Sequence, residues 1–304
     1  MNKLTWFLVA TLGLSASHVA NADQLLPEEI MHKVYTLYDG ETRVSRQSIS
    51  TCKYGISNRK IACSETPRIK VSESYGKDFG DNGEDAKSLT VLIEPAAERG
   101  IGILQYDYGD VSRDSDQWIY LSALGKPKRV ATGNADDEDE PKKGSLFGSE
   151  FSLEDMEKVR PKDYTYSILK EVTYNQRPCW IIQMTPTEKR ARNSNYSKMV
   201  VWVDRERFQE YKVQYYDRKG VYVKQKTQVG WQQQGDIWYS RKTIMNNKIT
   251  KRISILDKEQ IVFNVAIDDE FLTIRSLSDA AFRERNMEEL KGHFSYDKLV
   301  KNTD

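Results

Sequence analysis

Cysteine offers the most specific chemistry in this 304-residue sequence. Cys52 and Cys63 flank the segment KYGISNRKIA, which contains a glycine and an Asn-Arg turn candidate. In an oxidising compartment this spacing predicts a disulfide that closes a hairpin, and the alternative is two small buried thiols. Cys179 lies in the apolar segment PCWIIQM, so we expect its thiol to pack as a small hydrophobic group.

Histidines and acidic residues give little indication of a metal or catalytic site. His32 and His293 have no Cys or His neighbour at the spacing of metal ligands. The acidic run 136–140 lacks the alternate spacing and central glycine of a calcium loop, so we expect a solvated loop. The sequence contains no nucleophile elbow, phosphate loop or dinucleotide fingerprint. We therefore expect no cofactor, metal or catalytic residue, with a hydrolase whose distant carboxyl groups meet in space as the alternative.

The first 22 residues have the pattern of a signal peptide. Lys3 precedes the uncharged, mostly apolar run 4–14, and a small-x-small motif ends at Ala22. The run is too short to cross a bilayer, which needs about 20 apolar residues. We expect cleavage after Ala22 and a mature periplasmic protein, 23–304, that does not span the membrane; the alternative is an uncleaved anchor.

The charge of the mature chain is balanced. Removal of the leader takes away one Lys and no acidic residue, which leaves 46 − 1 = 45 basic against 45 acidic residues. A nucleic-acid binder should show a basic excess or stripe, so we expect no nucleic-acid partner. The same balance argues against strong attachment of the whole protein to an anionic membrane.

The hydrophobic pattern predicts a mainly β fold with a few helices. Helices are expected at 27–38, 152–159 and 278–291. Between them the period changes to two, and short turns join the segments, which favours antiparallel pairing. The expected strands are 43–51, 87–94, 101–108, 117–121, 128–131, 164–169, 180–185, 199–204, 211–216, 221–229, 237–244, 248–256 and 261–265.

No linker and no regular repeat divides the chain, and 133–146 reads as a charged loop. We therefore expect one domain with a core at about 27–277 and a helical tail at 278–304. Its architecture should be a single long curved antiparallel sheet with helices across one face.

The stretch from Asp116 to Met156 carries a family resemblance. It reads DQWIYLSALGKPKRV, then an acidic loop, then GSLFGSEFSLEDM. This resembles the LolA-like outer-membrane lipoprotein-sorting family, in the branch often found with RND/MMPL-type exporters. That family shows a Trp-x-Tyr-Leu strand, a basic segment ending in Arg, and a Gly-Ser-Asp-Phe run before an acidic short helix. The matching positions here are Trp118, Tyr120, Leu121, Arg129, Gly148, Ser149, Glu150, Phe151, Glu154 and Asp155.

The resemblance implies a fold and a function. The fold would be an incomplete, half β-barrel with helices covering its concave face, and the function would be carriage of lipoprotein acyl chains across the periplasm. Glu150 departs from the usual Asp, so the charge is kept but a tight turn made by the shorter side chain is not implied. The runner-up is a sensor or adaptor of the same fold that docks and regulates an envelope protein.

Candidate site residues follow from the same motif and from the strand pattern. Aromatic and aliphatic side chains on the strands are expected to line the hydrophobic cavity, with an ordinary core as the alternative. They are Trp118, Tyr120, Leu121, Phe147, Phe151, Trp202, Val213 and Tyr215. The structural motif residues are Arg129, Gly148, Ser149, Glu150 and Asp155. Arg129 is expected to pair with Glu150 or Asp155, with a solvent-facing pair as the alternative.

The expected partners are lipid or lipoprotein acyl chains, together with an inner-membrane RND/MMPL-type exporter. The resemblance, and not the composition, carries this expectation.

Overall fold

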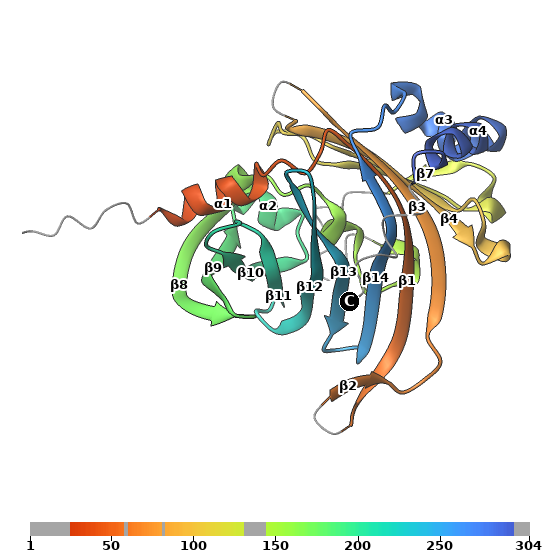
Figure 1. Cartoon of the computed structure of the whole chain (residues 1–304). Helices are drawn as coiled ribbons and strands as arrows, with labels where there is room; N and C mark the ends of the chain where they lie inside the picture. Colours follow the sequence, from red (N-terminus) through yellow and green to blue (C-terminus); the bar gives the residue numbers. More distant parts are fainter. Residues whose placement is uncertain (1–24, 58–59, 81–82, 131–143, 295–304) are drawn as a thin grey trace, which may run out of the picture.

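The computed structural model describes residues 25–57, 60–80, 83–130 and 144–294. The signal peptide expected at 1–22, most of the loop expected at 133–146 and the last ten residues of the tail lie outside the described residues. One 14-stranded antiparallel sheet dominates the fold, curved into an open trough (Figure 1). Its strand order is β7-β6-β5-β4-β3-β1-β14-β13-β12-β11-β10-β9-β8, and β2 pairs only with β1. The expected mainly β half-barrel is confirmed.

Short turns connect most neighbouring strands, as the alternating pattern predicts. The strands are β1 Thr42–Ser57, β2 Lys60–Cys63, β3 Arg68–Phe79, β4 Asp85–Glu94, β5 Gly102–Asp107, β6 Asp116–Tyr120, β7 Pro127–Arg129, β8 Tyr164–Tyr174, β9 Arg177–Pro186, β10 Tyr196–Asp204, β11 Glu210–Asp217, β12 Tyr222–Gln234, β13 Ile237–Asn247 and β14 Arg252–Phe263.

The sequence pattern does not predict β3, although β3 is central to the sheet. Its buried side includes a carboxylate, Glu73, next to Val71 and Tyr75 in the alternation. Glu73 is fully buried and accepts a hydrogen bond of 2.6 Å from the Tyr75 hydroxyl. A charged residue at a core position hides the period-two signal, because buried carboxylates are rare unless they are partnered.

The helices are few and short. They are α1 Pro27–Tyr35, α2 Glu188–Arg192, α3 Ile274–Ser278 and α4 Ala280–Lys291, with 3₁₀ turns η1 Ala96–Glu98, η2 Ser122–Leu124, η3 Leu146–Gly148, η4 Leu153–Met156, η5 Pro161–Asp163 and η6 Asp269–Leu272. The helix expected at 152–159 is only the turn η4, and α1 ends three residues before the expected position. None of the helices in the described ranges has the length and apolarity needed to cross a bilayer.

Two hydrophobic clusters lie on opposite faces of the sheet. The inner core joins side chains of β5, β9–β11, β13 and β14 to α1 and η3, which only the concave face can bring together. The outer core joins β1, β3, β4 and β5 to η6, α3 and α4. Successive residues of one strand divide between the two clusters, because side chains alternate across a sheet: Ile103 belongs to the inner core and Leu104 to the outer core.

The helices therefore divide between the faces. The first helix, α1, buries Ile30 and Met31 in the inner core and lies across one end of the trough (Figure 1). The C-terminal helices cover the outer face instead, where Phe271 packs edge-on against Tyr75 with ring centroids 5.0 Å apart. Helices thus cover parts of both faces, and not the concave face alone.

Candidate functional site

A cavity of about 740 Å³ opens at the end of the trough that α1 crosses. It lies between the C-terminal end of α1, the start of β1, the β3–β4 connection and η5. Its size falls in the range of small-molecule sites, which span about 300–1,000 Å³. The apolar and aromatic part of the lining consists of Val34, Tyr35, Leu37, Tyr38, Tyr108, Val111, Val159, Pro161 and Trp238. The charged part consists of Asp39, Glu41, Lys77, Asp78, Glu84, Lys158, Arg160, Lys162 and Glu210.

Ion pairs fix several charges at the rim of the cavity. Arg43 donates to Asp39 at 2.8 Å and to Asp78 at 2.7 Å, and Lys158 lies 3.3 Å from Asp78. Burial raises the pKa of Asp39, although Arg43 opposes the shift. Burial would lower the pKa of Arg43, but the two carboxylates outweigh it and the pKa rises, which keeps the guanidinium charged. The lining therefore holds fixed charges of both signs beside apolar side chains.

Tyr35 separates this cavity from a second, narrower space of about 50 Å³ inside the trough. The Tyr35 hydroxyl donates to Glu210 at 3.1 Å and lies 3.3 Å from the sulfur of Met184, while Lys226 lies 3.2 Å from Glu210. Burial, with Glu210 next, raises the pKa of Tyr35 well above its usual value, so the phenol stays a neutral donor.

The inner space is lined by apolar side chains and by charged ones, the latter being Glu154, Asp155, Glu157, Arg190, Glu210 and Lys226. Tyr35, Val159 and Glu210 line both spaces, so these side chains form the partition between them. The apolar walls of the inner space are Met184, Met199, Val201, Val213 and Tyr215. Removal of the partition would join the outer cavity to the inner core.

A buried polar network holds η4 against the concave face. Asp155 is fully buried and accepts hydrogen bonds from the backbone of Ser152 at 2.7 Å and from the Tyr196 hydroxyl at 2.7 Å. Lys224, with 8 % of its side chain exposed, pairs with the same carboxylate at 2.5 Å. Ser152 and Asp155 thus form the capping box that the sequence predicts, and the motif aspartate anchors this segment inside the trough.

Glu154 anchors the same turn on its other side. Its carboxylate accepts from Arg190 at 3.1 Å, from the Ser194 hydroxyl at 2.6 Å and from the Asn195 backbone at 2.9 Å. The charged groups of η4 are therefore partnered, as buried charges must be if they are not to destabilise the fold.

Six of the eight proposed ligand-wall residues fall into two groups. Phe151, Val213 and Tyr215 are buried in the inner core and Phe147 packs against it, whereas Trp118 and Tyr120 pack against the outer core beneath the C-terminal helices. Val213 and Tyr215 line the inner space, and within the described chain none of the eight residues lines the larger cavity.

The remaining two ligand-wall residues belong to neither cluster. Trp202 alternates along β10 with Val201 and Val203 of the inner core, so its side chain lies on the outer face of the sheet. There the Lys212 ammonium lies 3.5 Å from the centroid of the Trp202 ring. Leu121 is half-buried just beyond β6.

The structural motif residues shape the turn before η4. Gly148 has a φ of 75°, a left-handed conformation that suits glycine, and the Ser149 hydroxyl accepts from the Phe151 backbone at 3.3 Å. Glu150 reaches Arg252 at 3.0 Å and Asn247 at 2.8 Å, so the longer side chain bridges to the β13–β14 turn.

The expected ion pair of Arg129 is not formed. Arg129 pairs instead with Asp116, on the neighbouring strand β6, while Glu150 pairs with Arg252 and Asp155 with Lys224. Proximity in the motif suggested the partners, but antiparallel pairing places Arg129 beside Trp118, close to Asp116.

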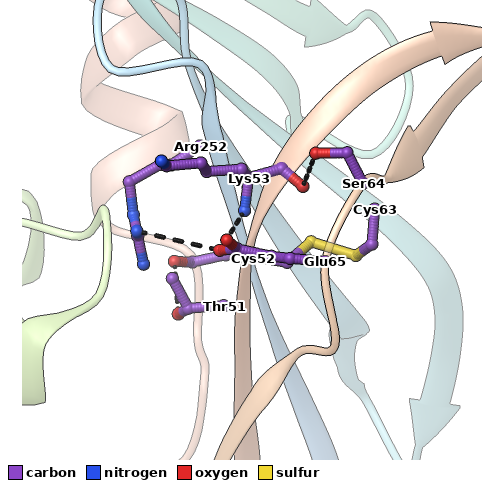
Figure 2. The surroundings of a disulfide bond; sticks show 8 residues. Thr51, Cys52, Lys53, Cys63, Ser64, Glu65 and Arg252 are labelled. Atoms are coloured by element: carbon purple, nitrogen blue, oxygen red, sulfur yellow. Dashed lines mark hydrogen bonds and ion pairs between the residues drawn. A yellow bond between two sulfur atoms is a disulfide. The ribbon is translucent and has the colours of Figure 1, made fainter.

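The disulfide expected between Cys52 and Cys63 is present, with an S–S distance of 2.04 Å (Figure 2). It joins β1 and β2 at the base of a hairpin. Cys179 is a fully buried thiol, and burial raises its pKa to about 11. Among the described residues, no group of three or more His, Cys, Asp and Glu side chains could hold a metal ion.

The cavity has no counterpart in the sequence pattern. Its residues come from α1, η5 and strand ends that are far apart in the chain, such as Tyr35 and Glu210, which are 175 positions apart. The available signal was α1 itself, whose apolar face had to pack against another part of the protein.

Comparison with known proteins supports the fold. A family model described as an uncharacterized protein matches residues 84–279, which is more than half of the chain. No curated protein matches the sequence. A DUF1329 family protein from Desulfovibrio piger is 22% identical, with a TM-score of 0.71 over 83% of this chain and 97% of that one.

Two further solved structures are similar. A protein domain from Vibrio parahaemolyticus, described as outer membrane lipoprotein-sorting, is 24% identical, with a TM-score of 0.70 over 83% of this chain and 98% of that one. A LolA superfamily protein from Nitrosomonas europaea is 16% identical, with a TM-score of 0.59 over 82% of this chain and 98% of that one. The chain therefore belongs to the family of uncharacterized proteins that this model describes, and it shares the half-barrel fold of the three solved structures.

Proposed function

We propose that the protein is a periplasmic, non-catalytic carrier that binds the apolar chain of a lipid, lipoprotein or other amphiphile. The cavity of about 740 Å³ carries this proposal, because its lining combines apolar side chains with fixed charges. An amphiphile has the same division between chain and headgroup. The leader-like N-terminus, the disulfide and the lipoprotein-sorting relatives support the periplasmic location.

A carrier of this kind must match the free energy that a chain loses when it leaves a bilayer. Each buried methylene contributes about 0.8 kcal/mol, so a chain of about ten methylenes requires about 8 kcal/mol of apolar contact. The outer cavity alone offers a limited apolar wall. We propose that the chain displaces Tyr35 and Val159 and extends into the inner core.

The inner core is suited to such entry because it contains methionines. Met31, Met184, Met199 and Met245 are buried there, and unbranched thioether side chains adapt their shape to a neighbour at small cost. Phe151, Val213 and Tyr215 would then contact the chain, while Trp118 and Tyr120 support the C-terminal helices.

The resemblance further suggests that an inner-membrane RND/MMPL-type exporter supplies or receives the cargo.

An adaptor that docks another envelope protein is the second candidate. The polar network around Asp155 and Glu154 fills part of the concave face, which limits the room for a long chain. A protein that only docks a partner would not need an open cavity.

Native mass spectrometry of gently purified protein tests the carrier. We expect a co-purifying lipid on the wild type, and its loss in Val159→Trp, which places an indole in the partition between the two spaces. Leu124→Trp is the matched control, because Leu124 lies exposed on η2, 43% accessible and outside the cavity.

The outcomes separate the two candidates. Lipid on the wild type and on Leu124→Trp, but not on Val159→Trp, supports the carrier. A wild type free of lipid, which also extracts none from vesicles, supports the adaptor and rejects the carrier.

A further inference from the structure

The end of the sheet opposite the cavity exposes three large aliphatic side chains, which we name the hairpin face: Ile56, Ile61 and Ile69. Their exposed fractions are 75%, 46% and 60%. Figure 1 shows the β1–β2 hairpin projecting beyond the sheet, away from α1. Single exposed aliphatic residues are normal on protein surfaces, but several on one face of a projecting hairpin indicate a contact surface.

Strand register places the three isoleucines on one face. Ile56 pairs directly with Ile61 across the hairpin, so their side chains lie side by side. Ile69 pairs with Ser50, which is six residues before Ile56 in β1. The shift of register in β1 lies earlier, between Arg46 and Gln47, so the even spacing from Ser50 to Ile56 keeps all three on the same side.

The hairpin is held rigidly at its base (Figure 2). The disulfide joins Cys52 to Cys63, and the Ser64 backbone donates to Lys53 at 2.9 Å. On the other side of β1, the Tyr54 backbone N–H donates a hydrogen bond of 2.9 Å to the carbonyl oxygen of Lys251, in the β13–β14 turn. A pinned hairpin presents its apolar face without the entropic cost of ordering a loose loop.

Unpaired cations lie at the same end of the sheet, where Lys251 is level with Tyr54 and Lys53 and Arg68 occupy strand positions that alternate with those of the isoleucines. Lys53, Arg68 and Lys251 are exposed, and among the described residues they form no ion pair. The nearby carboxylates of Glu65 and Glu150 already interact with Arg252, at 4.0 and 3.0 Å. The charge of the whole chain is balanced, so this positive region is local. Two copies of it would repel each other, which argues against a dimer through this face.

We propose that the hairpin face docks on the surface of an anionic phospholipid bilayer. The isoleucines enter the boundary between headgroups and acyl chains, and the long Lys and Arg side chains at this end of the sheet reach lipid phosphates. Another exposed aliphatic residue at the same end, Ile249 in the β13–β14 turn, extends the contact. In this orientation the cavity opens away from the bilayer. The docking is independent of whether the cavity holds cargo.

Vesicle flotation of the mature full-length protein tests the docking. We expect flotation with vesicles of phosphatidylethanolamine and phosphatidylglycerol, and little with phosphatidylcholine alone. The double variant Ile56→Glu/Ile61→Glu should lose about tenfold or more in bound fraction, because it replaces apolar contact with two charges that the lipid repels. Ile274→Glu, at a position on α3 whose exposure (42%) is close to that of Ile61 (46%), is the control and should float like the wild type.

Several results would overturn the proposal. Equal flotation of the double variant and the wild type would do so, as would equal binding to both vesicle types or no binding at all. A dimer in sedimentation velocity that the double variant abolishes would assign the face to a second copy. Circular dichroism checks that each variant is folded. Val159→Trp should still float, so a failure of the carrier proposal and a failure of the docking proposal remain distinguishable.

Discussion

Asp155 and Lys224 form an ion pair with almost no solvent contact on either side. The Asp155 carboxylate also accepts hydrogen bonds from the Ser152 backbone and the Tyr196 hydroxyl, so the stabilisation of both buried charges depends on the position of this one carboxylate. At such a site the loss of one partner leaves the other charge buried, and that penalty exceeds the benefit of the intact pair.

We expect Asp155→Asn to lower the free energy of unfolding by about 3–5 kcal/mol, because Lys224 keeps a buried charge without its partner. Urea denaturation followed by tryptophan fluorescence measures the change. Asp269→Asn, in a pair with Lys77 where the carboxylate is 63% exposed, should cost less than about 1 kcal/mol. Equal losses in the two variants would contradict the assignment.

Asp107 gives the stability a dependence on pH. Burial raises its pKa to about 6, although Ser115 and Gln105 donate hydrogen bonds that oppose the shift. A carboxyl group in an unfolded chain titrates near pH 4, so between about pH 4 and 6 the folded protein binds more protons. Its contribution to the free energy of unfolding therefore falls as the pH rises through this interval.

We expect Asp107→Asn to remove that dependence, since the amide does not titrate. The difference in unfolding free energy between variant and wild type should change by up to about 3 kcal/mol between pH 4 and pH 7. Urea titrations at a series of pH values measure it. Asp236→Asn, at an exposed turn, is the control, and a variant profile parallel to that of the wild type would reject the role of Asp107.

At the scale of elements, the hairpin of β1 and β2 depends on its disulfide. β2 is four residues long and pairs with no other strand, so little else holds it to the protein. We expect Cys52→Ala/Cys63→Ala to lower the free energy of unfolding by about 2–4 kcal/mol. Thermal unfolding of both proteins with and without reductant measures this, and reductant should affect only the wild type.

The hydrophobic period of the sequence predicted most strands, and it also predicted the first and the last helix, α1 and α4. Both periods are local signals that a single sequence carries. β3 escaped it because Glu73 occupies a buried position with Tyr75 as its partner. The helix expected at 152–159 shortened to η4 because its acidic residues turn inward to bind Lys224, Arg190 and Ser194. The capping box marked the start correctly, but tertiary hydrogen bonds decided where the turn ends.

The candidate site was harder to predict than the fold. Aromatic residues on strands identify buried positions, but they do not say which face of the sheet each one reaches once both faces carry a core. Trp118 and Val213 both occupy apolar positions of an alternating strand, yet Trp118 packs against the outer core and Val213 belongs to the inner core. The cavity itself depends on contacts such as that of Tyr35 with Glu210, for which one sequence holds no pattern.

At the scale of the whole molecule, the two cores should respond separately to mutation. We expect Trp118→Ala to lower the free energy of unfolding by about 2 kcal/mol, because it removes a half-buried ring that packs edge-on against Tyr106. The amount of lipid bound per folded molecule should stay the same. Native mass spectrometry beside urea denaturation measures both, and a loss of lipid without a loss of stability would return Trp118 to the ligand wall.

The division of neighbouring side chains between two cores also constrains how this protein can evolve. Deletion of one residue within β5 would move Ile103 and Leu104 to each other's side, along with every later position of the strand. Both clusters would be damaged by a single genetic event. Length changes in related chains should therefore gather in the connections between strands, whereas the doubly covered strands should keep their residue count even where their sequence drifts.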